Sequence, residues 1–363
     1  MRQTTVTINL SALAHNVQRV KQYAPTAQVM AMVKANAYGH GAVACLPAFD
    51  HIDALGVACL TEALALRQAH WTKKIVIIEG AFSEPEWQTC LEQHIDCVIH
   101  QQNQLDWALA HLPTSSTATV WLKFNTGMNR LGFDEDEILP IAKQLHEKGY
   151  QVVLTSHFAN ADVKDHPSNH AQIAKFDRVL SQLKQQVSPT TIQGSLCNSA
   201  GIINFPKQHH DWVRAGIMLY GATPLADASA DKLNLQPVMQ FDAQIMATHE
   251  LQVGECVGYG SRWQADKPSH IAIVSVGYAD GYPRVVNQSA YVTANDKKLP
   301  IIGRVAMDML MVDITGVADM DVGTSVQLWG ESPCIDEVAN WNDTIGYELM
   351  CLVTQRPIWR WNK

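Results

Sequence analysis

The sequence predicts an α/β fold in which a (β/α)8 barrel of the TIM type is followed by a β-rich C-terminal domain. Eight short apolar runs alternate with segments of helical period over residues 1–234. Near Gln236 the pattern changes to short strands separated by turns. The chain has 363 residues, more than the ~250–300 at which a single core stops growing. We therefore expect a barrel domain at 1–234 and a second domain at 235–363.

The barrel prediction depends on the spacing of its apolar runs. A first helix is expected to start near Ser11, and helical segments follow at 62–70, 136–148 and 169–185. The acidic run 134–137 suits the first turn of a helix, where negative charge complements the macrodipole. The eight expected strands lie at 29–33, 54–58, 74–79, 95–99, 118–123, 151–156, 191–195 and 211–214.

The second domain is expected to be rich in strands. Segments 238–246 and 270–276 have strand character, and residues typical of turns separate them. One helix is expected near 332–340, and the polar segment 227–234 would join the two domains. A closed barrel and a sandwich both fit this density of short strands.

Composition favours a globular enzyme that acts on small molecules. Hydrophobic residues make up 47% and charged residues 17% of the chain. The net charge of −8 and the absence of a run of Lys and Arg argue against nucleic acid or an anionic membrane as partner. The eight cysteines have no metal-ligand or disulfide-framework spacing. The first ten residues lack the apolar core of a signal peptide, so we expect a cytoplasmic location.

Polar side chains follow the expected barrel strands at their carboxyl ends, the face that carries the active site in such barrels. Lys34 follows the first strand and Lys123 ends the fifth, with Arg130 seven residues later. The later strands are followed by His157, by Asn198 and Ser199, and by Arg214. A lysine amine held at a strand end is available for Schiff-base chemistry.

Two segments contain residues that suit a phosphate group. Ser199 offers a hydroxyl at an expected helix start, and Gly216 lets the backbone approach a ligand closely. Together with a reactive lysine, a phosphate cradle is what pyridoxal phosphate requires, whereas a lysine-based aldolase needs the lysine alone. Ordinary helix capping and turn formation are the simpler functions of these residues.

The sequence resembles the alanine racemase family, which uses pyridoxal phosphate and has a barrel domain, over nearly its whole length. Seven motifs in family order carry the resemblance: AMVKANAYGHG at 31–41, TGMNRLG at 126–132, SHFA at 156–159, RAGIMLYG at 214–221, VGYG at 257–260, GYADG at 277–281 and GRVAMD at 303–308. The resemblance implies the interconversion of L-alanine and D-alanine. It is compatible with D-alanine supply for peptidoglycan and with D-alanine breakdown.

The resemblance implies two bases on opposite faces of the substrate. Lys34 would bind the cofactor as a Schiff base and act as one base, and Tyr259 of the partner subunit would act as the other. His157 and Arg214 would favour the anion of that tyrosine. Arg214 would also face the pyridine nitrogen, where its permanent charge disfavours protonation and weakens the ring as an electron sink.

The resemblance also assigns residues that hold the cofactor and the substrate. Tyr38 lies one helical turn from Lys34, so both can face the cofactor. Arg130 would bind the substrate carboxylate together with Met307 from the partner subunit. Lys123 matches a position that is often carbamylated, although Asn125 replaces the usual Asp nearby. The expected cofactor-binding residues are Lys34, Tyr38, Asn198, Ser199, Arg214, Gly216, Ile217 and Tyr347.

The C-terminal motifs correspond to the family's entryway for small amino acids, and they imply a homodimer. The residues concerned are Tyr278, Asp280, Arg284, Arg304 and Asp308. Because Tyr259 and Met307 lie in the second domain and Lys34 in the first, a complete site would require two chains.

Four other functions remain open on the sequence. A related decarboxylase would place an acidic residue where Arg214 stands. A racemase for serine or basic amino acids differs from one for alanine by only ~1–3 kcal/mol of pocket contacts. A non-catalytic carrier of pyridoxal phosphate would need neither Tyr259 nor a second domain. A metal site at Asp162, His166 and His170 would need a helix that Pro167 interrupts, so no metal is expected.

Overall fold

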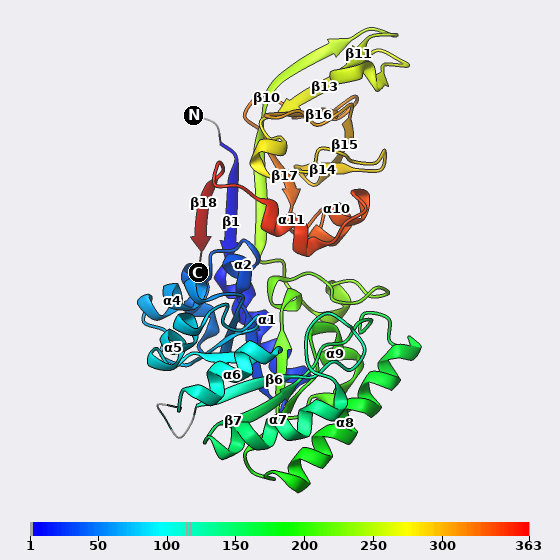
Figure 1. The fold of residues 1–363 in the computed structure, drawn as a ribbon. Helices are drawn as coiled ribbons and strands as arrows, with labels where there is room; N and C mark the ends of the chain where they lie inside the picture. Colours follow the sequence, from blue (N-terminus) through cyan, green and yellow to red (C-terminus); the bar gives the residue numbers. More distant parts are fainter. Residues whose placement is uncertain (1–2, 114, 116–117, 363) are drawn as a thin grey trace.

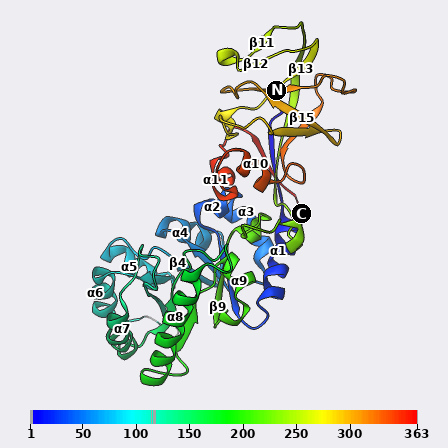
Figure 2. The same cartoon turned by 90° about the vertical axis from the view of Figure 1, so that its right-hand side faces the viewer.

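The computed structural model describes residues 3–113, 115 and 118–362. Met1 and Lys363, the outer limits of the two expected domains, lie outside the described residues. Arg2, which belongs to the N-terminal segment that lacks the features of a signal peptide, lies outside them as well. Figures 1 and 2 show a barrel with helices on its outside and a β-rich domain beyond one end of it. In the described part of the chain, none of the helices is long and apolar enough to span a membrane.

The barrel consists of eight parallel strands, as predicted. Neighbouring strands pair in the order β8-β7-β6-β5-β4-β3-β2-β9, and the amide of Arg214 donates to the carbonyl of Cys197 across the remaining gap at 2.9 Å. The inner strand residues Val29, Met30 and Ala31 are fully buried. The strands are β2 (Gln28–Met32), β3 (Ala54–Val57), β4 (Lys74–Ile77), β5 (Asp96–Ile99), β6 (Thr119–Lys123), β7 (Gln151–Thr155), β8 (Ile192–Ser195) and β9 (Trp212–Ala215).

Helices connect the barrel strands and start at recognisable signals. Asn9 caps α1 by accepting from the amide of Ala12 at 2.9 Å. The predicted acidic turn begins α7, where the amide of Asp134 donates to Glu137 at 2.9 Å. The helices of this domain are α1 (Leu10–Tyr23), α2 (Lys34–Tyr38), α3 (Ala42–Cys45), α4 (Leu60–Gln68), α5 (Glu84–Glu92), α6 (Gln102–Ala110), α7 (Glu135–Glu147), α8 (Pro167–Gln186) and α9 (Ser199–Asn204).

In the second domain the sheet closes on itself. The order β13-β16-β15-β14-β17-β10 is completed by a direct β10–β13 pairing, so the closed barrel, and not the sandwich, is observed. The strands are β10 (Met239–Leu251), β11 (Cys256–Val257), β12 (Trp263–Gln264), β13 (Ser269–Val274), β14 (Tyr291–Ala294), β15 (Lys297–Ile302), β16 (Leu310–Asp313) and β17 (Ser325–Trp329). The predicted helix near 332–340 is α10 (Ile335–Trp341), and α11 (Gly346–Leu352) follows it.

The two ends of the chain join this second sheet. β1 (Thr5–Asn9) pairs with β10 and with β18 (Ile358–Asn362), and Figure 1 shows β1 and β18 side by side. Neither strand was predicted from the sequence, because both pair over long sequence distances. The N-terminal segment therefore connects the sheet of the second domain directly to α1 of the barrel.

Candidate active site

Lys34 is the first residue of α2, which follows β2 at the end of the barrel that faces the β-rich domain (Figure 1). The turn that follows it is left-handed, with φ values of 51°, 53°, 56° and 52° at the four residues Ala35, Asn36, Ala37 and Tyr38. Such residues cost ~1–2 kcal/mol each in this conformation. The predicted helical turn therefore exists with the opposite hand, and backbone strain of this kind is typical of functional sites.

Three groups converge where a phosphate cradle was predicted. The amide of Gly216 donates to Oγ of Ser199 at 2.8 Å, and both residues are buried. A Cβ on Gly216 would lie 2.8 Å from the hydroxyl oxygen of Tyr38, so only glycine leaves this space open. Asn198 instead caps α9, because its side chain accepts from the amide of Gly201 at 2.9 Å.

Two aromatic rings lie near the side chain of Tyr38, the last residue of the left-handed turn. The ring of Tyr38 lies 4.9 Å from that of Tyr220 and 5.6 Å from that of Tyr347 between ring centroids. Tyr347 comes from α11, so the second domain contributes to this end of the barrel of its own chain. Ile217 follows Gly216, is buried and begins the short helical turn η3 (Ile217–Tyr220) that carries Tyr220.

Arg214 on β9 is buried and has an extensive set of hydrogen bonds. One of its terminal nitrogens donates to Oγ of Ser195 at 2.6 Å, and the other donates to the carbonyl of Ser156 at 2.6 Å and to Nδ1 of His157 at 3.3 Å. Its Nε has no hydrogen-bond partner among the described residues. Burial lowers the pKa of Arg214 to about 10, so the guanidinium stays charged at neutral pH.

Positive charges gather around His157 at the ends of β6, β7 and β9. Burial and then the charge of Arg214 lower the pKa of His157 well below its usual value, and Lys123, Arg130 and Lys34 act in the same direction. Burial, with Arg214 and Arg130, lowers the pKa of Lys123 to about 7. The side chains predicted from the strand ends thus lie close enough for the charges of Lys34, Lys123, Arg130 and Arg214 to act on His157.

The loop after β6 carries Arg130 and is shaped by Asn125. The side-chain oxygen of Asn125 accepts from the amides of Gly127 at 3.2 Å and Asn129 at 3.1 Å, and its nitrogen donates to Asn129 at 3.0 Å. An aspartate could accept the same amide bonds but could not donate the third. Asn125 therefore keeps the two amide bonds that the more common acid could accept and adds one that the acid could not donate.

The two residues predicted to act from a partner subunit, Tyr259 and Met307, and the entryway residue Tyr278 are exposed in the single chain. Tyr259 is 72% exposed, Met307 53% and Tyr278 39%. Tyr259 lies between β11 and β12, which Figure 1 and Figure 2 place far from the barrel. Within one chain Tyr259 is thus not brought to Lys34.

Arg356 is a residue near the entryway motifs that sequence reasoning missed. It pairs with the buried Asp280 at 3.3 Å and with Asp308 at 2.6 Å. Asp280 also accepts from the amide of Gly277 at 2.9 Å. Arg356 lies outside the recognised motifs, so its sequence position did not indicate a role. The acidic residues Asp280 and Asp308, in two neighbouring motifs, could have indicated that a positively charged side chain lies near them.

The two entryway arginines differ in their surroundings. Arg304 lies against the turn that carries Tyr259, because a Cβ on Gly260 would lie 2.9 Å from one of its terminal nitrogens. Arg284 is exposed in the loop between η6 (Tyr278–Asp280) and β14. Both therefore belong to the second domain's surface in the single chain.

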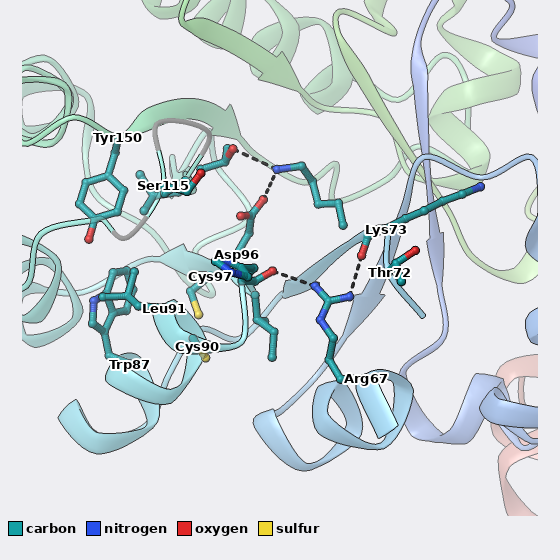
Figure 3. A pocket seen from close by; sticks show the side chains of 16 residues that line it. Arg67, Thr72, Lys73, Trp87, Cys90, Leu91, Asp96, Cys97, Ser115 and Tyr150 are labelled. Atoms are coloured by element: carbon teal, nitrogen blue, oxygen red, sulfur yellow. Dashed lines mark hydrogen bonds and ion pairs between the residues drawn. The ribbon is translucent and has the colours of Figure 1, made fainter. Parts of the chain in front are cut away.

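A second cavity lies at the opposite end of the barrel, where β4, β5 and β6 begin (Figure 3). Its charged groups already have partners, since Lys74 pairs with Asp96 at 2.5 Å and Arg67 donates to backbone carbonyls such as that of Lys73 at 2.8 Å. None of the predicted site residues, all of which the structure describes, lines this cavity. The barrel end that holds Lys34 is therefore the candidate active site.

Comparisons with known proteins identify the family of the chain. A model of the alanine racemase N-terminal domain matches residues 8–224, and a model of its C-terminal domain matches residues 238–360. The chain belongs to the alanine racemase family. It is therefore an isomerase whose reaction is the interconversion of L-alanine and D-alanine, and the proposed resemblance is confirmed.

Individual relatives cover the whole chain. An alanine racemase from Psychrobacter sp. (strain PRwf-1) is 52% identical over 371 residues, which cover 99% of both chains. The structure of alanine racemase from Acinetobacter baumannii covers 100% of both chains at 45% identity with a TM-score of 0.94. Alanine racemase from Bartonella henselae with covalently bound pyridoxal phosphate covers 100% of both chains at 29% identity with a TM-score of 0.88.

Individual residues argue against two of the alternative functions, the related decarboxylase and the metal site. Arg214, and not an acid, occupies the position that a related decarboxylase would need to be acidic. His166 caps α8, where its Nδ1 accepts from the amide of Ser168 at 3.3 Å. Among residues 3–113, 115 and 118–362, no group of three or more His, Cys, Asp or Glu could hold a metal ion.

Proposed function

We propose that this chain binds pyridoxal phosphate at the barrel mouth and racemises alanine with two bases, Lys34 and Tyr259 of the partner subunit. The observation that carries the proposal is the convergence of Lys34, the Tyr38–Gly216–Ser199 cradle and Arg214 at one end of the barrel. The covalently bound pyridoxal phosphate of the Bartonella henselae protein supports it.

The residues present fit this cofactor. The cradle offers the hydroxyls of Tyr38 and Ser199 beside Gly216, where a Cβ would fill the space, and Ile217 adds a backbone amide. Gly216, whose amide donates to Oγ of Ser199, would orient that hydroxyl toward the phosphate. Tyr347 lies beside Tyr38 and would contribute its hydroxyl. The Nε of Arg214, which has no partner among the described residues, would donate to the ring nitrogen. Asn198 would act by fixing the start of α9 beside the phosphate.

The residues at the barrel mouth would have separate roles in the reaction. When bound, pyridoxal phosphate supplies electron withdrawal that makes the α-proton of alanine acidic. The amine of Lys34 would hold the cofactor covalently and would exchange the α-proton on one face. Arg130 would bind the substrate carboxylate, with Met307 of the partner subunit beside it.

The second base would depend on the tautomer of His157. Arg214 can only donate, so Nδ1 of His157 must accept and the ring proton must lie on Nε2. That N–H, together with the nearby positive charges, would stabilise the anion of Tyr259 of the partner subunit. A tyrosine anion so stabilised could remove the α-proton from the face opposite Lys34.

The pKa of Lys123 supports its carbamylation. With a pKa of about 7, a large part of its amine is uncharged at neutral pH and can attack CO2. The carbamate would carry a negative charge next to Arg130 and would orient its guanidinium. The same charge would balance the surrounding cations.

One assay tests the proposed function as a whole. The loaded enzyme is incubated separately with L-alanine, L-serine and L-lysine, and optical rotation is followed. We expect L-alanine to lose its rotation fastest, because Tyr278 of the entryway and Met307 beside the substrate favour a small side chain. Retained rotation of alanine, with pyridoxal phosphate bound at Lys34, would reject the proposal.

A further inference from the structure

His40 is fully buried and lies six residues after Lys34. Its Nδ1 lies 3.0 Å from the carbonyl oxygens of both Ala37 and Tyr38. Since carbonyl oxygens only accept hydrogen bonds, Nδ1 must carry the proton. Burial lowers the pKa of His40 to about 4, so the ring stays neutral. Nε2 then has a lone pair with no partner among the described residues.

The two carbonyls belong to the left-handed turn between Lys34 and Gly39. Internal bonds link the amide of Ala37 to the carbonyl of Val33 at 2.8 Å and that of Gly39 to the carbonyl of Ala35 at 3.0 Å. A right-handed turn would make equivalent hydrogen bonds, and it would avoid the close approach of Cβ atoms to carbonyl oxygens that the left-handed form requires. The internal bonds therefore do not favour the left-handed form over the right-handed one. Contacts from outside the turn must do so.

Such contacts exist at both ends of the turn. At its start the amide of Ala35 donates to Glu62 at 2.8 Å, and at its end the N–H of His40 binds two carbonyls. The ring of His40 is itself held, because it lies 4.5 Å from Tyr220, whose hydroxyl donates to the carbonyl of Met32 at 2.8 Å. His40 is thus anchored to the strand that carries Lys34.

We propose that His40 is a positioning residue, whose Nδ1–H selects the left-handed turn and so aims Lys34 and the Tyr38 hydroxyl at one cofactor. This proposal rests on the proposed function, in which Lys34 holds the cofactor and Tyr38 its phosphate. A histidine that merely filled space would be replaced equally well by either amide side chain. A histidine that acts through Nδ1 would not.

Two amide substitutions separate these cases. Asparagine places its NH2 group near the position of Nδ1, whereas glutamine places it near that of Nε2. His40→Asn should therefore bind pyridoxal phosphate within about threefold of the native apoenzyme, and His40→Gln about tenfold or more weakly, given two lost hydrogen bonds. The dissociation constant is measured on the apoenzyme by quenching of tryptophan fluorescence.

His209 provides a matched control at the other end of the barrel. It is also buried, it precedes β9, and its Nε2 donates to the carbonyl of Ile202 at 2.8 Å. Here glutamine should preserve the bond and asparagine should lose it. His209→Asn should lower the thermal midpoint of the apoenzyme while leaving the dissociation constant for pyridoxal phosphate unchanged.

A glycine variant tests the role of the turn itself. Ala35 is exposed and has a φ of 51°, so Ala35→Gly removes the conformational cost without opening a cavity. In the His40→Gln background it should recover much of the lost affinity. If His40→Gln alone does not fold, the single variant Ala35→Gly is compared with the double variant Ala35→Gly/His40→Gln. Weaker binding of pyridoxal phosphate by the double variant then supports the proposal.

The outcomes distinguish the proposal from the function on which it rests. Unchanged affinity of folded His40→Gln, or equal loss in His40→Asn and His40→Gln, would overturn the positioning role. Failure of the native apoenzyme to bind pyridoxal phosphate would instead reject the proposed function.

Discussion

The guanidinium of Arg214 donates to Nδ1 of His157 across 3.3 Å, and this bond fixes the proton of the imidazole on Nε2. The same positive charge, after burial, lowers the pKa of His157 well below its usual value. The pair therefore presents a neutral N–H donor toward the barrel mouth at the pH of an ordinary assay.

The first prediction concerns the titration of His157. In the native protein its ring should stay neutral at the pH where a free histidine takes up its proton, because the pKa of His157 is lowered well below its usual value. Nuclear magnetic resonance follows this titration. Arg214→Gln should raise the pKa of His157, because a positive neighbour is lost. Since the unfolded state binds this proton below about pH 6.5, His157 should cost stability as the pH falls below that value. An unchanged titration in Arg214→Gln would contradict this account.

The second prediction concerns the direction of catalysis. Tyr259→Phe should slow α-proton removal from L-alanine by on the order of 10²–10⁴, and removal from D-alanine much less. The measurement is exchange of the α-hydrogen in heavy water, started from each enantiomer separately. Equal losses from both enantiomers would undo the assignment of faces.

The third prediction concerns Lys123. Bicarbonate labelled with carbon-13 should give a carbamate signal that grows as the pH rises through about 7, where the amine loses its proton. Lys123→Arg cannot form the carbamate, because its guanidinium keeps its charge. A signal of equal size in Lys123→Arg, or none in the native protein, would exclude carbamylation.

The fourth prediction concerns the cradle. Gly216→Ala should weaken binding of pyridoxal phosphate about tenfold or more, because the new Cβ would lie 2.8 Å from the hydroxyl of Tyr38. Ser199→Ala leaves the space open and should weaken binding less. Both apoenzymes are checked by thermal unfolding, and native-like binding by folded Gly216→Ala would place the phosphate elsewhere.

The fifth prediction concerns Arg356. Arg356→Met removes the ion pair that Arg356 makes with the buried carboxylate of Asp280 and should lower the free energy of unfolding by about 2 kcal/mol. Arg356→Lys should recover part of this loss, and urea denaturation of the apoenzyme measures both. Stability equal to that of the native protein in Arg356→Met would show that Asp280 is satisfied by its other contacts.

Local patterns explain what could be predicted from the sequence. The buried runs fixed the positions of the barrel strands, and the carboxyl-end rule then placed Lys34, Lys123, His157 and Arg214 at one mouth. No local rule could indicate the hand of the turn at Ala35, because alanine has no preference for positive φ. The strands β1 and β18 and the ion pairs of Arg356 depend on distant partners. The role of Tyr259 came from the family resemblance alone.

The central claim is that two chains build each site, with Lys34 from one and Tyr259 from the other. Subunit complementation tests it most directly. Lys34→Ala and Tyr259→Phe, each nearly inactive alone, are unfolded together, refolded and reloaded with pyridoxal phosphate. A shared site predicts recovery of roughly a quarter of native racemase activity, because half of the dimers carry one intact site. No recovery, in a mixture verified to contain hybrid dimers, would contradict the account.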